Sequence, residues 1–383
     1  MHLTKQKKSA VIFTMRYPDD AGYVWNTIAQ SRDVAASHLL TDATSFIAYP
    51  KLTGSATYTS KYLSPVELDC YDYSEIGLSK IVAFIKKNNV KVIVFMSALP
   101  STINLKALSN LGVKTVNTEN DSFDSFKRDM LPVRFLKFFM RKLLKRQLHT
   151  MHLANAKSQM KFLSEYAMIP NSRLGLVRDG IDCSRFKPGD RQAARQQLGF
   201  EQYRFLIICV AQARSEKRLD FIIKAAKKIV DQRPDEYVGF LYVGDGPPVA
   251  EWKKLVDELG LTDRFKFAGR QNDLVPYYQA SDLMVHAAER ESFGLAIVEG
   301  MACGLPTVAS AAAGPKETIL DGQTGLLIDI DDFDGFINGV LRYIDDKDLT
   351  QQHGRNAHEH AVRSYSIERQ GAEMAAHIVD LIK

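Results

Sequence analysis

The fold is decided by Glu291-Ser292-Phe293-Gly294-Leu295-Ala296-Ile297-Val298-Glu299, in which two glutamates stand eight positions apart. An apolar run follows the glycine and predicts a helix that ends at Gly304-Leu305-Pro306, and residues 307–310 predict the next strand. A glycine-bearing turn that opens a helix leaves backbone N–H groups free, and the helix dipole favours an anion there. The stretch therefore predicts an anion-binding turn.

The two glutamates suit hydroxyl groups. Glu291 precedes the turn and Glu299 lies about two turns into the predicted helix. An ionised carboxylate accepts several hydrogen bonds, as the hydroxyls of a sugar or a ribose require. The alternative is an ordinary helix with two solvated glutamates, since charged side chains are mostly exposed. For an isolated pair the second interpretation prevails, and the neighbouring residues favour the first.

Three further blocks extend the pattern. They are Met301-Ala302-Cys303-Gly304-Leu305-Pro306-Thr307-Val308-Ala309-Ser310, Gly314-Pro315-Lys316-Glu317 and Asp321-Gly322-Gln323-Thr324-Gly325-Leu326-Leu327. Together with Glu291-x7-Glu299 they resemble the donor site of the retaining glycosyltransferases of family 4, strongly over residues 209–328 and less elsewhere. The resemblance implies an α/β chain with the GT-B fold, in which two Rossmann-like parallel-sheet domains face a central cleft.

Length and composition fit two domains of a soluble protein. The chain has 383 residues, of which 45% are hydrophobic and 25% charged, and a net charge of +5. No apolar run reaches about 18 residues, the length that crosses a bilayer, and residues 11–15 predict a buried strand, not a signal peptide. The four cysteines lack Cys-x-x-Cys spacing, which argues against a zinc site or a disulfide framework and favours a reducing cytoplasm.

Short apolar runs alternate with helical patterns in the first half of the chain. Strands are predicted at 11–15, 91–95, 114–116 and 152–155, and helices at 81–87, 105–111 and 157–166. Such alternation predicts parallel β-α-β units whose ligand loops share one sheet edge. Polar residues at 187–197 predict a linker between domains at 1–190 and 191–365. The resemblance implies that the first is the acceptor-side domain and that the second binds the nucleotide sugar. The resemblance implies that the last helix, 366–383, packs back on the first domain.

Two loops of the first domain carry site candidates. In the family, a glycine loop after the first strand approaches the donor phosphates and the acceptor, and Gly22 is what remains of its glycine pair here. A plain strand-to-helix turn is the alternative. A histidine that helps to hold the donor sugar in the family is missing near Thr118, where Glu119, Asn120 and Asp121 follow. Asn120 and Asp121 are therefore the candidates on the acceptor and sugar side.

Residues 127–146 form the most charge-biased segment, with basic and apolar residues interleaved at helical spacing. A basic amphipathic helix suits an anionic membrane surface, and an interior helix with a solvated polar face is an equal alternative. No nucleic-acid motif accompanies the charges, so nucleic acid is not an expected partner. The membrane interpretation predicts a cytoplasmic protein that is peripheral on the inner face of the membrane.

The second domain supplies the diphosphate site. Lys217 and Arg214 follow a buried strand, 205–210, at a turn into a helix, and two cations there suit a diphosphate. In the family an arginine stands five positions before the lysine. That position is Gln212 here, and Arg214 is its predicted substitute.

Other positions follow from the same resemblance. Gly244 belongs to a Gly-x-Gly-Pro turn that shapes the nucleotide crevice, and Arg270 borders the nucleobase. Asp179 replaces the usual asparagine before Gly-Ile-Asp in a hinge signature. His286 has no partner at metal-ligand spacing and is predicted to be a structural histidine.

The resemblance implies a metal-independent, hexosyltransferase-type enzyme that retains the anomeric configuration and uses a UDP- or GDP-linked sugar as donor, with no other cofactor. Lys217 and Arg214 neutralise the leaving diphosphate in this scheme, Glu291 holds hydroxyls of the transferred sugar, and Glu299 holds the ribose. The catalytic candidates are Lys217, Arg214 and Glu291, and the donor-binding candidates are Glu299, Ser292, Phe293, Gly294, Leu295, Gly22, Arg270 and Gly244.

The acceptor expected from the resemblance is a hydroxyl of a glycan or a lipid-linked sugar, in the assembly of cell-surface polysaccharide or glycolipid. Because basic residues take the place of a cation, the Asp19-Asp20 and Asp331-Asp332 pairs are predicted to be structural. Two other functions remain open: a GT-B sugar-nucleotide epimerase, which needs no acceptor, and a non-catalytic binder of nucleotide sugars.

Overall fold

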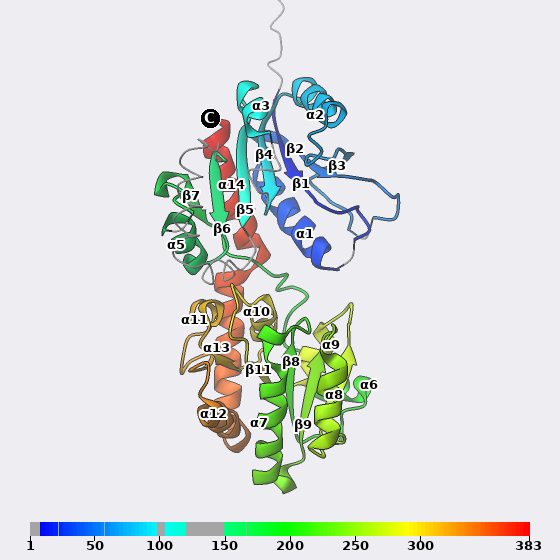
Figure 1. Ribbon diagram of the computed structural model, residues 1–383, viewed down its shortest axis with the longest axis vertical. Coiled ribbons are helices and arrows are strands. Elements are labelled where there is room, and N and C mark those ends of the chain that lie inside the picture. The colour runs from blue at the N-terminus through cyan, green and yellow to red at the C-terminus, as the bar shows by residue number, and fades with distance from the viewer. Residues whose placement is uncertain (1–7, 22, 57, 98–103, 120–148, 166) are drawn as a thin grey trace, which may run out of the picture. The chain divides into compact units, whose positions relative to one another are not determined.

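The computed structural model describes residues 8–21, 23–56, 58–97, 104–119, 149–165 and 167–383, which fold as two units (Figure 1). The first unit comprises residues 1–180 and 367–383, and the second comprises residues 181–366. Gly22, Asn120, Asp121 and the basic segment 127–146 lie outside the described residues.

The chain leaves the first unit at Gly180/Ile181, earlier than the boundary at 190/191 expected from the sequence. The Ile181 N–H donates to the Tyr365 carbonyl at 2.9 Å. Phe186 packs edge-on against Tyr278, with 6.2 Å between the ring centroids. These contacts make residues 181–190 part of the second unit, because their partners lie there.

The first unit contains a 7-stranded parallel sheet with the order β3-β2-β1-β4-β5-β6-β7. Its elements are β1 (Ser9–Thr14), α1 (Tyr23–His38), β2 (Ala43–Tyr49), β3 (Ser64–Glu67), α2 (Glu75–Asn88), β4 (Val90–Met96), α3 (Leu105–Asn110), β5 (Lys114–Glu119), β6 (Met151–Ala154), α5 (Lys157–Glu165), η3 (Asn171–Arg173), β7 (Leu174–Leu176) and α14 (Ile367–Ile382).

The last helix, α14, packs against α1 within the first unit. The two helices approach closely at Gly371, where a Cβ atom would lie 2.5 Å from Val34 Cγ1. The buried residues Met374, Ala375 and Ile378 of α14 join the core that covers one face of the sheet. The final helix is therefore an integral part of the first unit although it is encoded at the far end of the chain.

The second unit contains a 6-stranded parallel sheet with the order β10-β9-β8-β11-β12-β13. Its elements are α6 (Arg191–Leu198), β8 (Phe205–Val210), η4 (Ser215–Lys217), α7 (Leu219–Gln232), η5 (Pro234–Glu236), β9 (Val238–Val243), α8 (Val249–Glu258), β10 (Phe265–Gly269), α9 (Val275–Ala280), β11 (Leu283–His286), α10 (Leu295–Ala302), β12 (Thr307–Ser310), α11 (Ala313–Thr318), β13 (Gly325–Ile328), α12 (Phe333–Asp345) and α13 (Lys347–Tyr365).

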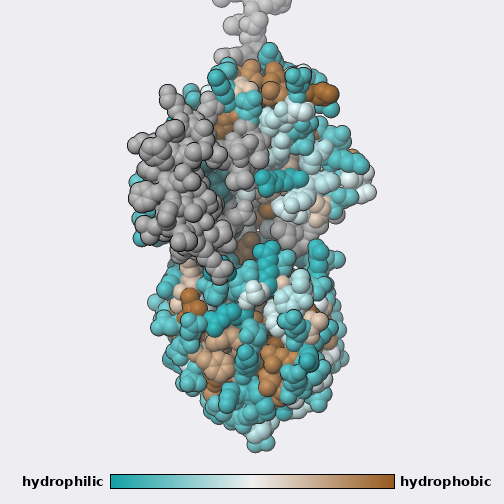
Figure 2. Space-filling model, viewed as in Figure 1, coloured by the Kyte–Doolittle hydropathy of each residue, from teal (hydrophilic) through white to brown (hydrophobic). Residues whose placement is uncertain are grey.

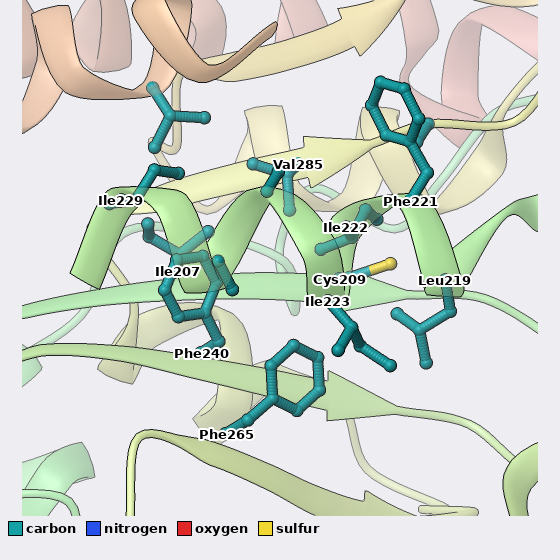
Figure 3. Close-up of a cluster of buried hydrophobic side chains, with 14 of the residues drawn as sticks. Ile207, Cys209, Leu219, Phe221, Ile222, Ile223, Ile229, Phe240, Phe265 and Val285 are labelled. Atoms are coloured by element: carbon teal, nitrogen blue, oxygen red, sulfur yellow. The ribbon is translucent and has the colours of Figure 1, made fainter. Parts of the chain in front are cut away.

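The core of the second unit explains why its strands are apolar along their whole length. Helix α7 buries Ile222, Ile223 and Ile229 against strand residues such as Ile207 and Phe240 (Figure 3). Helices also cover the other face of the sheet, so a central strand such as β8 is buried on both sides. This packing fixes the positions at which β8 and β11 end.

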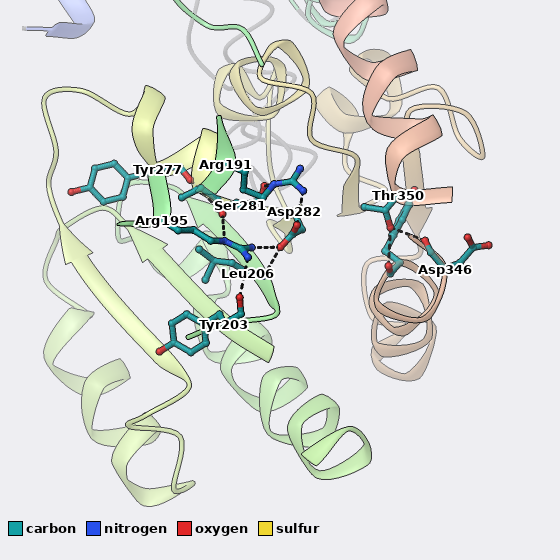
Figure 4. A network of polar contacts seen from close by, with 11 residues as sticks. Arg191, Arg195, Tyr203, Leu206, Tyr277, Ser281, Asp282, Asp346 and Thr350 are labelled. Atoms are coloured by element: carbon teal, nitrogen blue, oxygen red, sulfur yellow. Dashed lines mark hydrogen bonds and ion pairs between the residues drawn. The ribbon is translucent and has the colours of Figure 1, made fainter. Parts of the chain in front are cut away.

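The predicted linker at 187–197 contains a helix. Asp190 caps α6 by accepting the Ala193 N–H at 3.1 Å, and Gly199 ends the helix in the left-handed conformation. Arg191 and Arg195 lie four residues apart on one side of α6 and both bind Asp282 (Figure 4). The linker prediction was wrong because a polar composition cannot reveal that two arginines have a buried carboxylate as their partner.

In the view of Figure 2, apolar residues appear in separate groups among hydrophilic ones. Among the described residues, no helix is both long enough and apolar enough to span a bilayer.

Replacing Asp282 by alanine should destabilise the second unit strongly. Its carboxylate accepts Leu206 N–H at 2.7 Å and Arg191 Nη1 at 2.9 Å, and it also pairs with the largely buried Arg195. Removing one partner of a buried charge pair costs about 3–5 kcal/mol. Urea unfolding, followed by the fluorescence of buried Trp252 in a Trp25→Phe background, measures the loss.

The matched control is Asp345→Ala, which removes the partner of Arg233 from a half-exposed pair. That change should alter the free energy of unfolding by no more than about 1 kcal/mol. Equal effects of the two substitutions would contradict the structural role assigned to Asp282.

Candidate functional site

The order in which strands are added to the second sheet reverses between β8 and β11. Strands β9 and β10 extend from β8 on one side, and β12 and β13 extend from β11 on the other. In open parallel sheets, ligands bind outside the carboxyl ends of the strands at such a switch point. Lys217 follows β8 and Glu291 follows β11, so the two candidates flank this position from neighbouring loops.

The structure brings Lys217 and Glu291 together. Lys217 Nζ donates to Glu291 Oε2 at 2.7 Å, and both side chains are largely buried. His286, the last residue of β11, places its Nε2 atom 3.3 Å from the same carboxylate oxygen. The carboxylate therefore has a cation and an imidazole on one oxygen.

The environment of Glu291 keeps its carboxylate ionised. Burial alone opposes ionisation, but Lys217, which donates a hydrogen bond to the carboxylate, and His286 beside it hold the pKa of Glu291 well below its usual range. A carboxylate that is ionised and partly enclosed is a strong acceptor for hydroxyl groups.

Backbone hydrogen bonds fix the loops around this pair. The Glu289 N–H donates to Glu216 O at 3.1 Å and links the loop after β11 to the turn η4. The Gly314 N–H donates to Glu291 O at 2.8 Å from α11. A Cβ atom at Gly314 would lie 2.7 Å from the Phe293 carbonyl oxygen, so the Gly-Pro block must begin with glycine to pack on this turn.

Helix α10 opens at the predicted turn. Gly294 occupies the N-cap position with φ of 90°, a conformation that favours glycine. The first hydrogen bonds of the helix run from Ile297 and Val298 to the Gly294 carbonyl, so the amides of Leu295 and Ala296 precede the helical ladder. This end of α10 has the geometry that binds an anion.

The neighbouring candidates divide by exposure. Leu295 is 39% exposed, whereas Phe293 is buried and packs edge-on against Tyr365 with 5.6 Å between ring centroids. Ser292 is half-buried. Of this group, Phe293 has the geometry of a residue that shapes the turn through packing.

Glu299 lies in the interior face of α10 and is 7% exposed. Its Oε2 atom accepts the hydroxyl of Tyr278, on α9, at 2.9 Å. Tyr278 is fully buried, so its hydroxyl is a fixed donor that orients the Glu299 carboxylate.

Two glycines let the loops after β8 and β9 approach each other. A Cβ atom at Gly244 would lie 1.9 Å from the Ala211 carbonyl oxygen, and one at Gly246 would lie 2.4 Å from that of Ala213. The Ala213 N–H also donates to Asp245 O at 3.0 Å. The Gly-x-Gly-Pro turn therefore holds the loop that leads to Lys217.

The structure does not bring Arg214 into ion-pair distance of Glu291. Its guanidinium lies 3.9 Å from Glu216, and its side chain is 59% exposed. Arg270 is exposed. Arg218, the next residue after Lys217, has partners outside the site: it donates to the Ile330 carbonyl at 2.6 Å and lies 3.3 Å from Asp331.

The carboxylate pairs have structural partners. Asp19 Oδ1 accepts the Thr53 N–H at 2.8 Å and the Thr53 hydroxyl at 2.7 Å. Asp332 caps α12 by accepting the Gly335 N–H at 2.8 Å. Within the described residues, no group of three or more His, Cys, Asp or Glu side chains is arranged to hold a metal ion.

A cavity of about 640 Å³ lies at the opposite, amino edge of the second sheet. Its lining includes residues that precede β11 and β12, namely Ser281, Asp282 and Gly304, and residues of α13 such as Lys347 and Arg355. Ligands of parallel sheets bind at the carboxyl edge, so the candidate site is the one at Glu291.

Sequence reasoning did not identify Tyr278 as a site residue and treated His286 as purely structural. His286 ends a buried strand just before the acidic turn, and that position is the signal that could have linked it to Glu291. Tyr278 carries no such signal, because its contact with Glu299 depends on how α9 packs against α10.

Comparison with known proteins gives a family match for the second unit. Residues 190–360 match the family model described as glycosyl transferases group 1. N-acetyl-alpha-D-glucosaminyl L-malate synthase of Bacillus anthracis is 30% identical over 200 residues, which are 52% of this chain and 52% of that protein. The chain thus spans about half the length of this curated relative.

Solved structures match almost the whole chain. A glycosyltransferase from Rickettsia africae ESF-5 has a TM-score of 0.77 at 19% identity and covers 98% of this chain and 99% of its own. The Anabaena protein HepE in complex with UDP-glucose has a TM-score of 0.74 at 19% identity, over 97% of this chain and 99% of its own. These likenesses confirm the predicted fold class of two Rossmann-like parallel-sheet domains, as in GT-B proteins.

The Gly244→Ala variant should distort the loop that carries Lys217, because the new Cβ would overlap the Ala211 carbonyl. We expect a loss of about 1–3 kcal/mol in stability and weaker binding of UDP, measured by calorimetric titration. Gly260→Ala is the control, since that glycine also has positive φ but has open space around it. Parental affinity and stability in Gly244→Ala would show that the close approach of the two loops is dispensable.

Proposed function

We propose that this chain, whose second unit matches glycosyl transferases group 1 and whose fold is that of GT-B proteins, moves a sugar from a nucleotide-diphosphate sugar to an acceptor hydroxyl. The observation that carries the proposal is the Lys217–Glu291 pair at the switch point, beside the free amino end of α10. A cation, an ionised carboxylate and unpaired helix-end amides together suit a phosphorylated sugar.

The donor diphosphate is proposed to bind at the start of α10. Leu295 and Ala296 offer backbone N–H groups there, and Lys217 offers an ammonium group. Fixed donors aimed at charge that develops on a leaving group lower the barrier for its departure, because they need no reorganisation during the reaction. Arg214 supplies a second, mobile cation in this scheme, since its side chain is largely exposed.

The two glutamates hold hydroxyl groups. Glu291 is proposed to accept hydrogen bonds from the transferred sugar, and Glu299, oriented by Tyr278, from the ribose. The nucleotide of the donor is UDP or GDP in this proposal, and the Anabaena protein matched above was solved with UDP-glucose. Transfer with retention of configuration, independence of metal ions and membership of family 4 rest on the sequence motif Glu291-x7-Glu299.

The acceptor is proposed to be a hydroxyl of a glycan or a lipid-linked sugar, in cell-surface polysaccharide or glycolipid assembly. The basic segment 127–146 supports a membrane-proximal acceptor through its sequence alone. A cytoplasmic protein peripheral on the inner face of the membrane follows from that segment.

Lys217→Ala and Glu299→Gln should each lower donor turnover by about 10²–10³, the usual effect of removing one electrostatic donor or a charged contact from such a site. Glu299→Gln keeps an oxygen that can accept the Tyr278 hydroxyl, so the loss reports on charge and not on packing. The assay measures release of UDP or GDP from a panel of nucleotide sugars.

Lys224→Ala is the matched control, because this lysine lies on α7, the helix that follows Lys217, and forms an exposed pair with Asp220. It should turn over donor at the parental rate. The proposal fails if Lys217→Ala and Glu299→Gln are as active as Lys224→Ala. Formation of an isomerised nucleotide sugar without acceptor would identify an epimerase instead.

Anionic vesicles should sediment the chain at low salt and release it at high salt, because surface electrostatic attraction is screened by salt. Replacing the lysines and arginines of segment 127–146 by glutamine should abolish sedimentation, whereas neutral vesicles should not bind the parent. Equal sedimentation of parent and variant would remove the membrane proposal and leave the donor site untouched.

A further inference from the structure

Lys217 and His286 both lie next to the same carboxylate oxygen of Glu291. Lys217 Nζ lies 2.7 Å from Oε2, and His286 Nε2 lies 3.3 Å from the same atom. The His286 side chain is 3% exposed, and that of Glu291 is 15% exposed. Within this group the ammonium of Lys217 and the carboxylate of Glu291 cancel in charge, and the imidazole of His286 lies beside them.

The surroundings of His286 contain few other charges. The charge of Lys217 lowers the pKa of the Cys209 thiol, on β8, but burial outweighs it and raises that pKa to about 12, so the thiol stays neutral. Glu289 and Arg290 precede Glu291 and pair with each other at 3.3 Å. Among the described residues, the ionised group that the structure places against the imidazole is therefore Glu291, whose other charged neighbour is Lys217.

A bound diphosphate disturbs this balance. It brings at least two negative charges to the start of α10, and Lys217 is the cation that already lies at this position. As the ammonium turns toward phosphate oxygens, the enclosed Glu291 carboxylate loses part of its compensation. An excess of negative charge beside a buried imidazole favours the protonated form of the imidazole.

We propose that donor binding is coupled to proton uptake by His286, which takes over from Lys217 as the cationic partner of Glu291. One proton passes from solvent to the imidazole, which then carries N–H on both ring nitrogens, and no other bond changes. His286 is a positioning residue in this scheme: it keeps the Glu291 carboxylate ionised and oriented for sugar hydroxyls while Lys217 serves the diphosphate. The inference rests on the proposed function, since it needs the diphosphate at this site.

The test is calorimetric titration of the full chain with UDP, and in parallel with GDP, at pH 7.5–8.5 in buffers of different ionisation enthalpy. Above the second phosphate pKa of about 6 the nucleotide's own titration contributes little. The parent should take up roughly half to one proton per nucleotide, and its affinity should fall by up to about tenfold per pH unit as pH rises. His286→Gln, which keeps a neutral donor near the carboxylate, should bind nucleotide with no proton uptake and with affinity independent of pH.

His358→Gln is the matched control, because it removes another partly buried imidazole of the second unit, one that contacts the Ala302 carbonyl. It should keep the parental proton uptake. Nitrogen NMR of the imidazoles in the parent chain reads the same proton directly and applies even if His286→Gln does not fold.

Nucleotide binding without proton uptake by the parent would overturn the coupling and leave the proposed function standing, with Lys217 and Arg214 alone balancing the diphosphate. Undiminished uptake in His286→Gln would overturn it too. Absence of any UDP or GDP binding would remove the proposed function and this coupling together.

Discussion

The candidate site depends on one ion pair that joins two neighbouring strands through their loops. Lys217 follows β8 and Glu291 follows β11, and their side chains meet at 2.7 Å although 74 positions separate them in sequence. The pairing holds an ionised carboxylate in a largely buried place, where it would otherwise be unfavourable. The bond from Glu289 N–H to Glu216 O and that from Gly314 N–H to Glu291 O fix the backbone on either side.

Much of this arrangement could be predicted from the sequence. The predicted strands 205–210 and 307–310 coincide with β8 and β12, because buried parallel strands are continuous apolar runs. The turn at Gly294 follows from a glycine that opens an apolar helix. Lys217 and Glu291 were both candidates from their local motifs, a basic turn after a buried strand and an acidic residue before a glycine turn.

What the sequence could not supply was contact between side chains far apart in the chain. Helix α6 was taken for a linker, because the partner of its arginines, Asp282, lies about ninety positions away. The contact between Tyr278 and Glu299 depends on the packing of α9 and α10. Strand β2 was not predicted either, although it pairs with β1 from Ala43 to Ala48.

The first unit shows how two departures from the family pattern are accommodated. Asp179, in place of asparagine, is buried, and its carboxylate accepts Asn155 Nδ2 at 2.7 Å. Burial raises the pKa of Asp179, and the charge of buried Arg32 opposes that rise. Near the missing histidine, Glu119 on β5 pairs at 3.0 Å with His152 on β6.

The most direct test of the whole account is a crystal structure of the full chain with UDP. The account predicts the diphosphate within hydrogen-bond distance of Lys217 Nζ and the first amides of α10, and UDP in the cavity at the amino edge of the sheet would contradict it.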